Sequence, residues 1–387
     1  MNIRIPEGSC AGCCRYNEIV QALTAYLALL LQAADPYAAG MKALEEQKYD
    51  LASQEFSKAV EAAPGDYAAR FHLALADSLL GKDEEAIAGY RKVLELKPGL
   101  YEAELNLGMV LVRQKQFPEA IPHLKTAASL KPAEQRPAAY LADAELGLGR
   151  ALATAGKFEE AAPLFRGEQQ LELASLYEKA GRTADAIATY GKFPENAAAR
   201  ERMGNLLVVA GKPAEAIPHL EFAVQNSPTA ANRYALATAQ LRSGQPEKAL
   251  ALLEAALQSE PANAALRMTN GRVLRDLRRF PAAAQEFLKA VRTEPDNKEA
   301  WSELAGMLLL TENYPQALAA FDKLRALGED GPAQYYFRAI ALDRMKQYPD
   351  ALASYQKFLS LSENKFPDEE FKARQRIRVI QKELSKR

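Results

Sequence analysis

The amino-acid sequence predicts an all-α fold, a solenoid of stacked antiparallel helix pairs, from three observations. At 387 residues the chain is too long for one compact core of ordinary size, which favours a repeat array or several domains. With much alanine, 8% aromatics and few β-branched runs, its composition is typical of closely packed helices rather than sheets. Short sequence markers also recur along most of the chain with a period of 34 residues.

Three markers share this period. The first is an alanine, found at Ala52, Ala86, Ala120, Ala161, Ala186, Ala216, Ala249, Ala283, Ala317 and Ala351. The second is a proline that closes a helical stretch, found at Pro64, Pro98, Pro132, Pro194, Pro228, Pro261 and Pro295. The third is a small residue twelve positions before each alanine, such as Gly108 and Gly271. Small residues let two helices approach closely, and a larger side chain there would cost about 1 to 3 kcal/mol through overpacking.

The local sequence supports two helices in each repeat. Residues 84–97 place apolar side chains at spacings of three and four, which is one face of a helix. Glycine follows the first helix of several pairs, where a residue with positive φ ends a helix, at Gly81, Gly156, Gly181, Gly211 and Gly244. Proline then falls in the first turn of the second helix, at Pro118, Pro281, Pro315 and Pro349.

This pattern resembles the tetratricopeptide repeat (TPR). One of the clearest copies is "YEAELNLGMVLVRQKQFPEAIPHLKTAASLKP" at residues 101–132. The resemblance implies a right-handed superhelical solenoid, a TPR array whose first helices line a concave face. It also implies a non-catalytic scaffold or adaptor that binds a protein or peptide partner in that face. The alternative is a helical-repeat protein that binds single-stranded RNA.

The repeats divide the chain into five predicted segments. Residues 35–132 hold repeats 1 to 3, residues 133–194 hold irregular repeats 4 and 5, and residues 195–365 hold repeats 6 to 10. In the irregular segment we expect a long first helix at 136–155 and short second helices near 158–166 and 183–192, either as a relic of insertion and deletion or as a bend between two arms. Residues 366–387 form a capping helix with an apolar stripe at Ala373, Ile377, Ile380 and Leu384.

Residues 1–34 form an apolar leader. Residues 19–34 contain no charge and have the length of the apolar core of a secretory signal peptide, so the sequence favours export to the periplasm or the extracellular space. We therefore expect a mature chain that begins near Asp35 and has no stable membrane span. The alternative is a cytoplasmic protein in which this run packs on the first repeat. Cys10, Cys13 and Cys14 lie in the same leader, and three thiols without a nearby histidine do not predict a zinc site.

Composition and motifs argue against several classes of function. A net charge of −1 provides no basic excess for a phosphate backbone, so nucleic acid is not an expected partner. The only histidines, His72, His123 and His219, fall in separate repeats, so no catalytic triad or metal cluster is predicted. We expect no enzyme activity, no cofactor and no metal.

Candidate partner-binding residues follow from the resemblance, because positions 2, 5, 9 and 12 of first helices tend to face the groove of such arrays. These positions include Asn205, Tyr234, Thr238, Leu241, Arg272, Arg275, Tyr336 and Asp343. Arg272 and Arg275, three residues apart, should share a helix face, and we expect them to grip an acidic or C-terminal carboxylate group of a partner. The alternative is a solvated face paired with Asp276 and Glu286.

Overall fold

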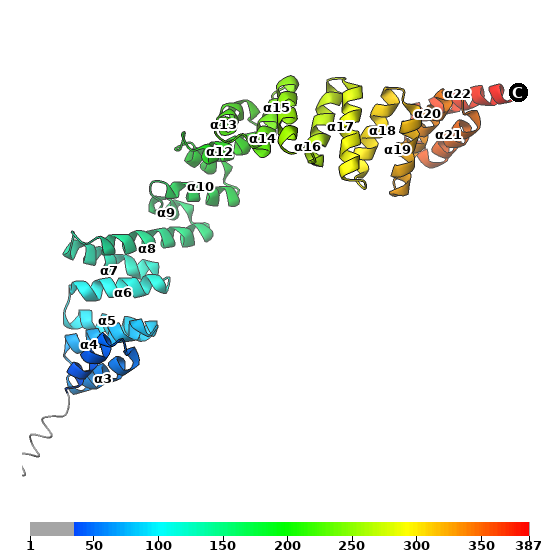
Figure 1. Ribbon diagram of the computed structural model, residues 1–387. Helices are drawn as coiled ribbons and strands as arrows, with labels where there is room; N and C mark the ends of the chain where they lie inside the picture. The colour runs from blue at the N-terminus through cyan, green and yellow to red at the C-terminus, as the bar shows by residue number, and fades with distance from the viewer. Residues whose placement is uncertain (1–34, 387) are drawn as a thin grey trace, which may run out of the picture. The chain divides into compact units, whose positions relative to one another are not determined.

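The computed structural model describes residues 35–386, where the secondary structure is helical and includes no strand (Figure 1). The predictions about the leader and the three cysteines concern residues 1–34 and lie outside the described residues. The chain divides into two compact units, with the division between Leu173 and Ala174, inside the segment predicted to be irregular. Consecutive helices α2 to α21 form ten pairs, and α22 follows them. The predicted all-α fold of helix pairs is confirmed.

The first unit is a stack of helix pairs that begins with three regular repeats. Its elements are α2 (Pro36–Glu45), α3 (Tyr49–Ala62), α4 (Tyr67–Leu79), α5 (Asp83–Leu96), α6 (Tyr101–Arg113), α7 (Phe117–Leu130), α8 (Gln135–Thr154), α9 (Phe158–Ala161) and the 3₁₀ turn η1 (Ala162–Leu164). The small marker residues lie where the two helices of a pair touch. A Cβ atom added to Gly108 would lie 2.6 Å from the side chain of Leu124, which is fully buried. The marker is therefore a packing requirement.

The fourth pair departs from the regular repeat. Helix α8 is 20 residues long, whereas α9 has only 4 residues before the chain tightens into η1. Phe165 follows η1 and is buried against the small residue Gly149, whose added Cβ would lie 3.0 Å from the Phe165 ring. Phe165 thus packs on Gly149 as Leu124 packs on Gly108, although it follows η1 instead of lying on a full second helix.

The second unit is also a stack of helix pairs, followed by α22. Its helices are α10 (Gln169–Lys179, which begins just before the division), α11 (Thr183–Tyr190), α12 (Ala197–Val209), α13 (Pro213–Asn226), α14 (Ala230–Arg242), α15 (Pro246–Ser259), α16 (Ala264–Asp276), α17 (Phe280–Thr293), α18 (Lys298–Leu310), α19 (Tyr314–Ala326), α20 (Pro332–Arg344), α21 (Tyr348–Ser362) and α22 (Pro367–Leu384). A continuous apolar core runs from α14 to α19 and contains fully buried Phe287 and Leu253. Stacking of neighbouring pairs, rather than one central core, buries the apolar faces.

The turn inside each pair contains one residue in the left-handed region. Glycine occupies it in five pairs as predicted, at Gly81, Gly156, Gly181, Gly211 and Gly244. Side chains that rarely adopt this conformation occupy the other five, at Gln47, Lys115, Arg278, Glu312 and Lys346. Backbone hydrogen bonds fix the same turn in both groups, for example from the Arg279 amide to the Leu274 carbonyl at 2.8 Å.

Helix α22 packs against the last helix pair. Ala373 and Ile380 are buried, and Ile377 and Leu384 pack beside them against α20 and α21. The acidic residues Asp368, Glu369 and Glu370 lie in its first turn, where the helix dipole favours negative charge. Among the described residues, none of the helices has the length and apolar character needed to span a bilayer.

Candidate functional site

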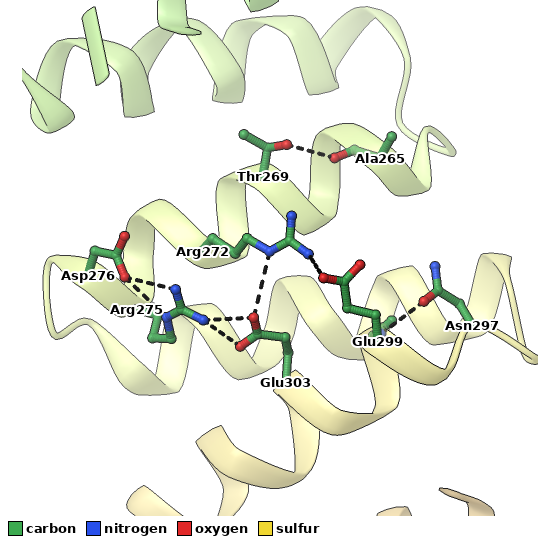
Figure 2. Close-up of polar contacts among 9 residues, drawn as sticks. Ala265, Thr269, Arg272, Arg275, Asp276, Asn297, Glu299 and Glu303 are labelled. Carbon is green, nitrogen blue, oxygen red and sulfur yellow. Dashed lines mark hydrogen bonds and ion pairs between the residues drawn. The ribbon is translucent and has the colours of Figure 1, made fainter. Parts of the chain in front are cut away.

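Arg272 and Arg275 lie on one face of α16, as their spacing predicts, and both point toward α18 (Figure 2). The Arg275 Nη1 atom donates to both carboxylate oxygens of Glu303, at 2.7 and 2.8 Å. Arg272 forms ion pairs with Glu299 and, at 3.6 Å from its Nε atom, with Glu303. Two cations of repeat 8 are therefore tied to two carboxylates of repeat 9. We call these four residues the arginine cluster.

The structure shows which carboxylates pair with Arg272 and Arg275, for which the sequence offered Asp276 and Glu286. Asp276 does contact Arg275, with the arginine Nε atom 3.1 Å from its carboxylate. Glu286 is not a partner of either arginine, because its carboxylate accepts from Arg267 at 2.7 Å. Hydrogen bonding to Glu303 raises the pKa of the Arg275 guanidinium above its usual value, so this arginine keeps its charge. Both arginines thus already have carboxylate partners within the chain.

The same positions recur on neighbouring first helices and form one continuous surface. One series, spaced by 34 residues, is Arg272, Gly306 and Ile340. A second series with the same spacing is Arg275, Leu309 and Asp343. The arginine cluster joins α16 to α18, a shared pocket joins α18 to α20, and an ion pair between Asp343 and Arg376 joins α20 to α22. We call this surface of α16, α18, α20 and α22 the first-helix face.

An open pocket of 560 Å³ lies on the first-helix face between α18 and α20. It is mainly apolar, and we call it the apolar pocket; its apolar lining includes Gly306, Leu309 and Leu310 of α18, Phe321 and Leu324 of the second helix α19, and Phe337 and Ile340 of α20. A Cβ atom added to Gly306 would meet nothing within 4 Å, so the missing side chain leaves room for the pocket. Phe337 is 44% exposed and Leu310 at the edge is 58% exposed. Apolar side chains gathered around an open pocket are typical of a binding surface.

A second pocket, of 520 Å³, adjoins the first and lies between α20 and α22. Its lining includes Arg344, Lys372 and Arg376, and we call it the basic pocket. The predicted residues Tyr336 and Asp343 both line it. Arg376 donates to Asp343 at 2.8 Å, so one of the three cations is neutralised within the pocket. Burial, together with the Glu369 carboxylate, raises the pKa of the Tyr336 phenol, which stays protonated at neutral pH.

The other predicted residues lie on earlier first helices in the same register. Asn205 is half-buried on α12, and Tyr234 and Thr238 lie on α14. The Thr238 hydroxyl donates to the Tyr234 carbonyl at 2.9 Å, so this hydroxyl is engaged by its own helix. Tyr234 is exposed. Thr238 is 34 residues before Arg272, which gives the two residues equivalent places in their repeats.

The histidines occupy different surroundings in each repeat. The strings around His123 and His219 are identical, yet the His123 Nδ1 atom lies 2.6 Å from a carboxylate oxygen of Glu104. Burial, followed by the nearby charge of Arg200, lowers the pKa of His219. Within residues 35–386, no group of three or more His, Cys, Asp or Glu side chains is placed to hold a metal ion.

Sequence reasoning missed the residues that form the apolar pocket. Gly306 and Phe337 carry no charge and match no motif, and both occur where the repeat pattern tolerates many residues. The sequence does contain one signal of the pocket, which is two small residues in a row. Ala305 already supplies the small packing residue of repeat 9. A second small residue directly after it, Gly306, is not needed for packing and indicates an open surface.

Comparisons with known proteins agree with this architecture. A family model of the tetratricopeptide repeat matches residues 37–101, 105–170, 171–231, 268–332 and 308–366, and another matches residues 207–269 and 240–287. None of the curated proteins matches the sequence.

Several solved structures are similar over part or most of the chain. The TPR domain of P58(IPK) is 19% identical with a TM-score of 0.29, covering 90% of this chain and 98% of that one. The C-terminal part of a TPR repeat-containing protein from Cytophaga hutchinsonii is 19% identical with a TM-score of 0.45, covering 52% and 84%. Yeast Tom70 is 18% identical with a TM-score of 0.33, covering 85% and 76%. Structural likeness this low carries no functional argument, but the repeat models cover most of the sequence, and the chain therefore belongs to the tetratricopeptide repeat family.

Proposed function

We propose that this protein is a non-catalytic scaffold that binds a protein or peptide partner on its first-helix face. The observation that supports this proposal is the apolar pocket between α18 and α20, which is open and edged by exposed Leu310 and Phe337. Soluble proteins seldom leave such side chains gathered on the surface without a binding role. Burying them against a partner would release roughly 25 cal/mol for each Å² of apolar surface covered.

A polypeptide fits this surface better than a small molecule does. The apolar pocket is open on one side and continues into the basic pocket, so the surface offers several contacts in a row. An extended segment can place successive side chains in such a row, which is a common mode of peptide recognition.

The arginine cluster has a different role in this proposal. A partner's carboxylate would have to compete with Glu299 and Glu303, which lie on the same protein and are already in place. The grip predicted for Arg272 and Arg275 therefore requires displacement of a neighbouring carboxylate. We propose that the cluster mainly ties repeat 8 to repeat 9.

Site-specific photo-crosslinking tests the proposed function. A photoreactive phenylalanine analogue at Phe337 should capture a polypeptide from the native source, and the adduct should be destroyed by protease but not by nuclease. The matched control carries the same analogue at Lys357, which is exposed on the second helix α21. Equal adducts at both positions, or a nuclease-sensitive adduct at Phe337, would contradict the proposal, and the latter would favour RNA.

A further inference from the structure

The two adjoining pockets on the first-helix face differ in chemistry and share an edge. Ile340 and Arg344, both on α20, line both of them. On one side lie Leu309, Phe337 and the space left by Gly306, and on the other lie Lys372 and Arg376 of α22. A ligand that crosses this edge would meet an apolar surface first and positive charge next.

Two cations at this place have no carboxylate of their own. Arg344 and Lys372 are exposed, and neither forms an ion pair with another side chain of residues 35–386. Asp343 is the acidic residue that lines the basic pocket, and it is held by Arg376 at 2.8 Å. Glu312 lines the apolar pocket but not the basic one. The basic pocket therefore keeps a net positive charge of about one, counting its three lining cations against Asp343 and the nearby Glu369, whose charge acts on Tyr336.

We propose that the two pockets form one docking site for an extended peptide that carries a large apolar side chain followed closely by an acidic side chain. The apolar side chain enters the apolar pocket between Leu309 and Phe337, and the carboxylate binds Arg344 and Lys372. This inference rests on the proposed function and specifies the partner's chemistry. The contrast with the arginine cluster supports it, since there the cations already bind Glu299 and Glu303, whereas here they remain available.

The size of the site agrees with this occupant. A volume of 560 Å³ exceeds that of any single side chain, so a bulky apolar residue fits without rearrangement of α18 or α20. Arginine can bind a carboxylate through two parallel hydrogen bonds, and Arg344 at the C-terminal end of α20 lies at the shared edge where a bound peptide would pass.

Selection from a displayed library of random ten-residue peptides tests the proposal with the full chain. We expect enrichment of peptides that contain a large apolar residue followed within a few positions by Asp or Glu. Gly306→Phe, which fills the apolar pocket, and the double variant Arg344→Glu with Lys372→Glu should each weaken binding of these peptides by at least about tenfold. Reversing the two charges should also shift the selection toward basic peptides.

Matched controls separate these effects from misfolding. Gly306→Ala leaves most of the pocket open, and Arg292→Glu with Lys357→Glu makes the same charge change on the second helices α17 and α21. Both controls should bind the selected peptides as the parent protein does. All variants should retain the helical circular dichroism of the parent.

Four results would overturn the inference. Enriched peptides that lack the apolar and acidic pair, or that bind the two pocket variants unchanged, would leave the proposed function in place but refute this site. Selected peptides resynthesised with an amidated C-terminus should bind as well as those with a free one, and a requirement for the free terminus would refute the acidic side chain as the ligand. Failure to enrich any peptide would count against the proposed function itself.

Discussion

Repeats 8 and 9 have the same helix-pair fold, but the exposed faces of their first helices differ in chemistry. Helix α16 of repeat 8 carries arginines on the first-helix face, and each is paired with a carboxylate of α18 (Figure 2). Helix α18 of repeat 9 has Gly306 and Leu309 at the equivalent positions, and these line an open pocket toward α20. One stretch of the surface is occupied by ion pairs within the protein, and the next is an open pocket.

This difference separates two kinds of position in a repeat. Gly271 and Ala305 are equivalent, and both are small because the second helix of the pair packs against them. The next residues, Arg272 and Gly306, do not take part in that packing and are free to differ. The fold is therefore specified by positions that all repeats share, and the chemistry of the first-helix face by positions at which the repeats differ.

The largest effect should come from Gly271→Ala in repeat 8. An added Cβ atom would lie 2.6 Å from the ring of Phe287, which is fully buried, so the pair must open or Phe287 must move. We expect a loss of about 1 to 3 kcal/mol in stability, measured by denaturant unfolding. In a Phe287→Ala background, which removes the ring, Gly271→Ala should cost much less, and an equal loss in both backgrounds would show that the clash is elsewhere.

Breaking the arginine cluster should have the next largest effect. In Glu303→Gln the side chain keeps its shape but loses the charge that holds Arg272 and Arg275. Because both arginines are partly exposed, we expect a loss of about 1 kcal/mol, and the difference from the parent protein should shrink in 1 M salt. Amide hydrogen exchange should locate the change in α16 and α18. An equal change in high salt would mean that packing, rather than charge, is responsible.

The fold could be predicted from sequence because its signals are local and repeated. Gly108, Gly204 and Gly271 recur at one position because a buried side chain leaves no room there. The turn residues were predicted only where they are glycine. Arg278 and Glu312 adopt the same left-handed conformation, but nothing in their residue type indicates it, since backbone hydrogen bonds of the turn impose it.

The site could be predicted only in part, for a similar reason. A spacing of three placed Arg272 and Arg275 on one helix face, which is a property of a single helix. The choice of Glu299 and Glu303 over Glu286 depends on how the next helix stacks. The apolar pocket depends on side chains from two repeats and on a missing side chain, so no pattern in one repeat could reveal it.

Gly306→Ala should change stability in the opposite direction to Gly271→Ala, although Gly306 lies only one residue after the position equivalent to Gly271. The added methyl group meets nothing within 4 Å, and alanine favours the helix over glycine. We expect stability to rise by about 0.5 to 1 kcal/mol, measured by the same unfolding experiment. A loss of stability would show that the apolar pocket closes in solution.

The smallest effect should come from the turns, where repeats 8 and 9 do not differ. Arg278 and Glu312 both have φ near 58°, whereas Gly244 holds the equivalent place in repeat 7 with φ of 73°. Replacing the side chain by glycine removes a strain of about 1 to 2 kcal/mol from the folded state. Glycine also gives the unfolded chain more conformational freedom, which lowers stability by about 0.4 to 1 kcal/mol. Arg278→Gly and Glu312→Gly should therefore each gain about 0.5 kcal/mol in denaturant unfolding.

Equal gains for the two variants would show that the backbone alone determines the conformation of the turn. A gain for Arg278→Gly without one for Glu312→Gly would instead couple the turn of repeat 9 to the apolar pocket that Glu312 lines.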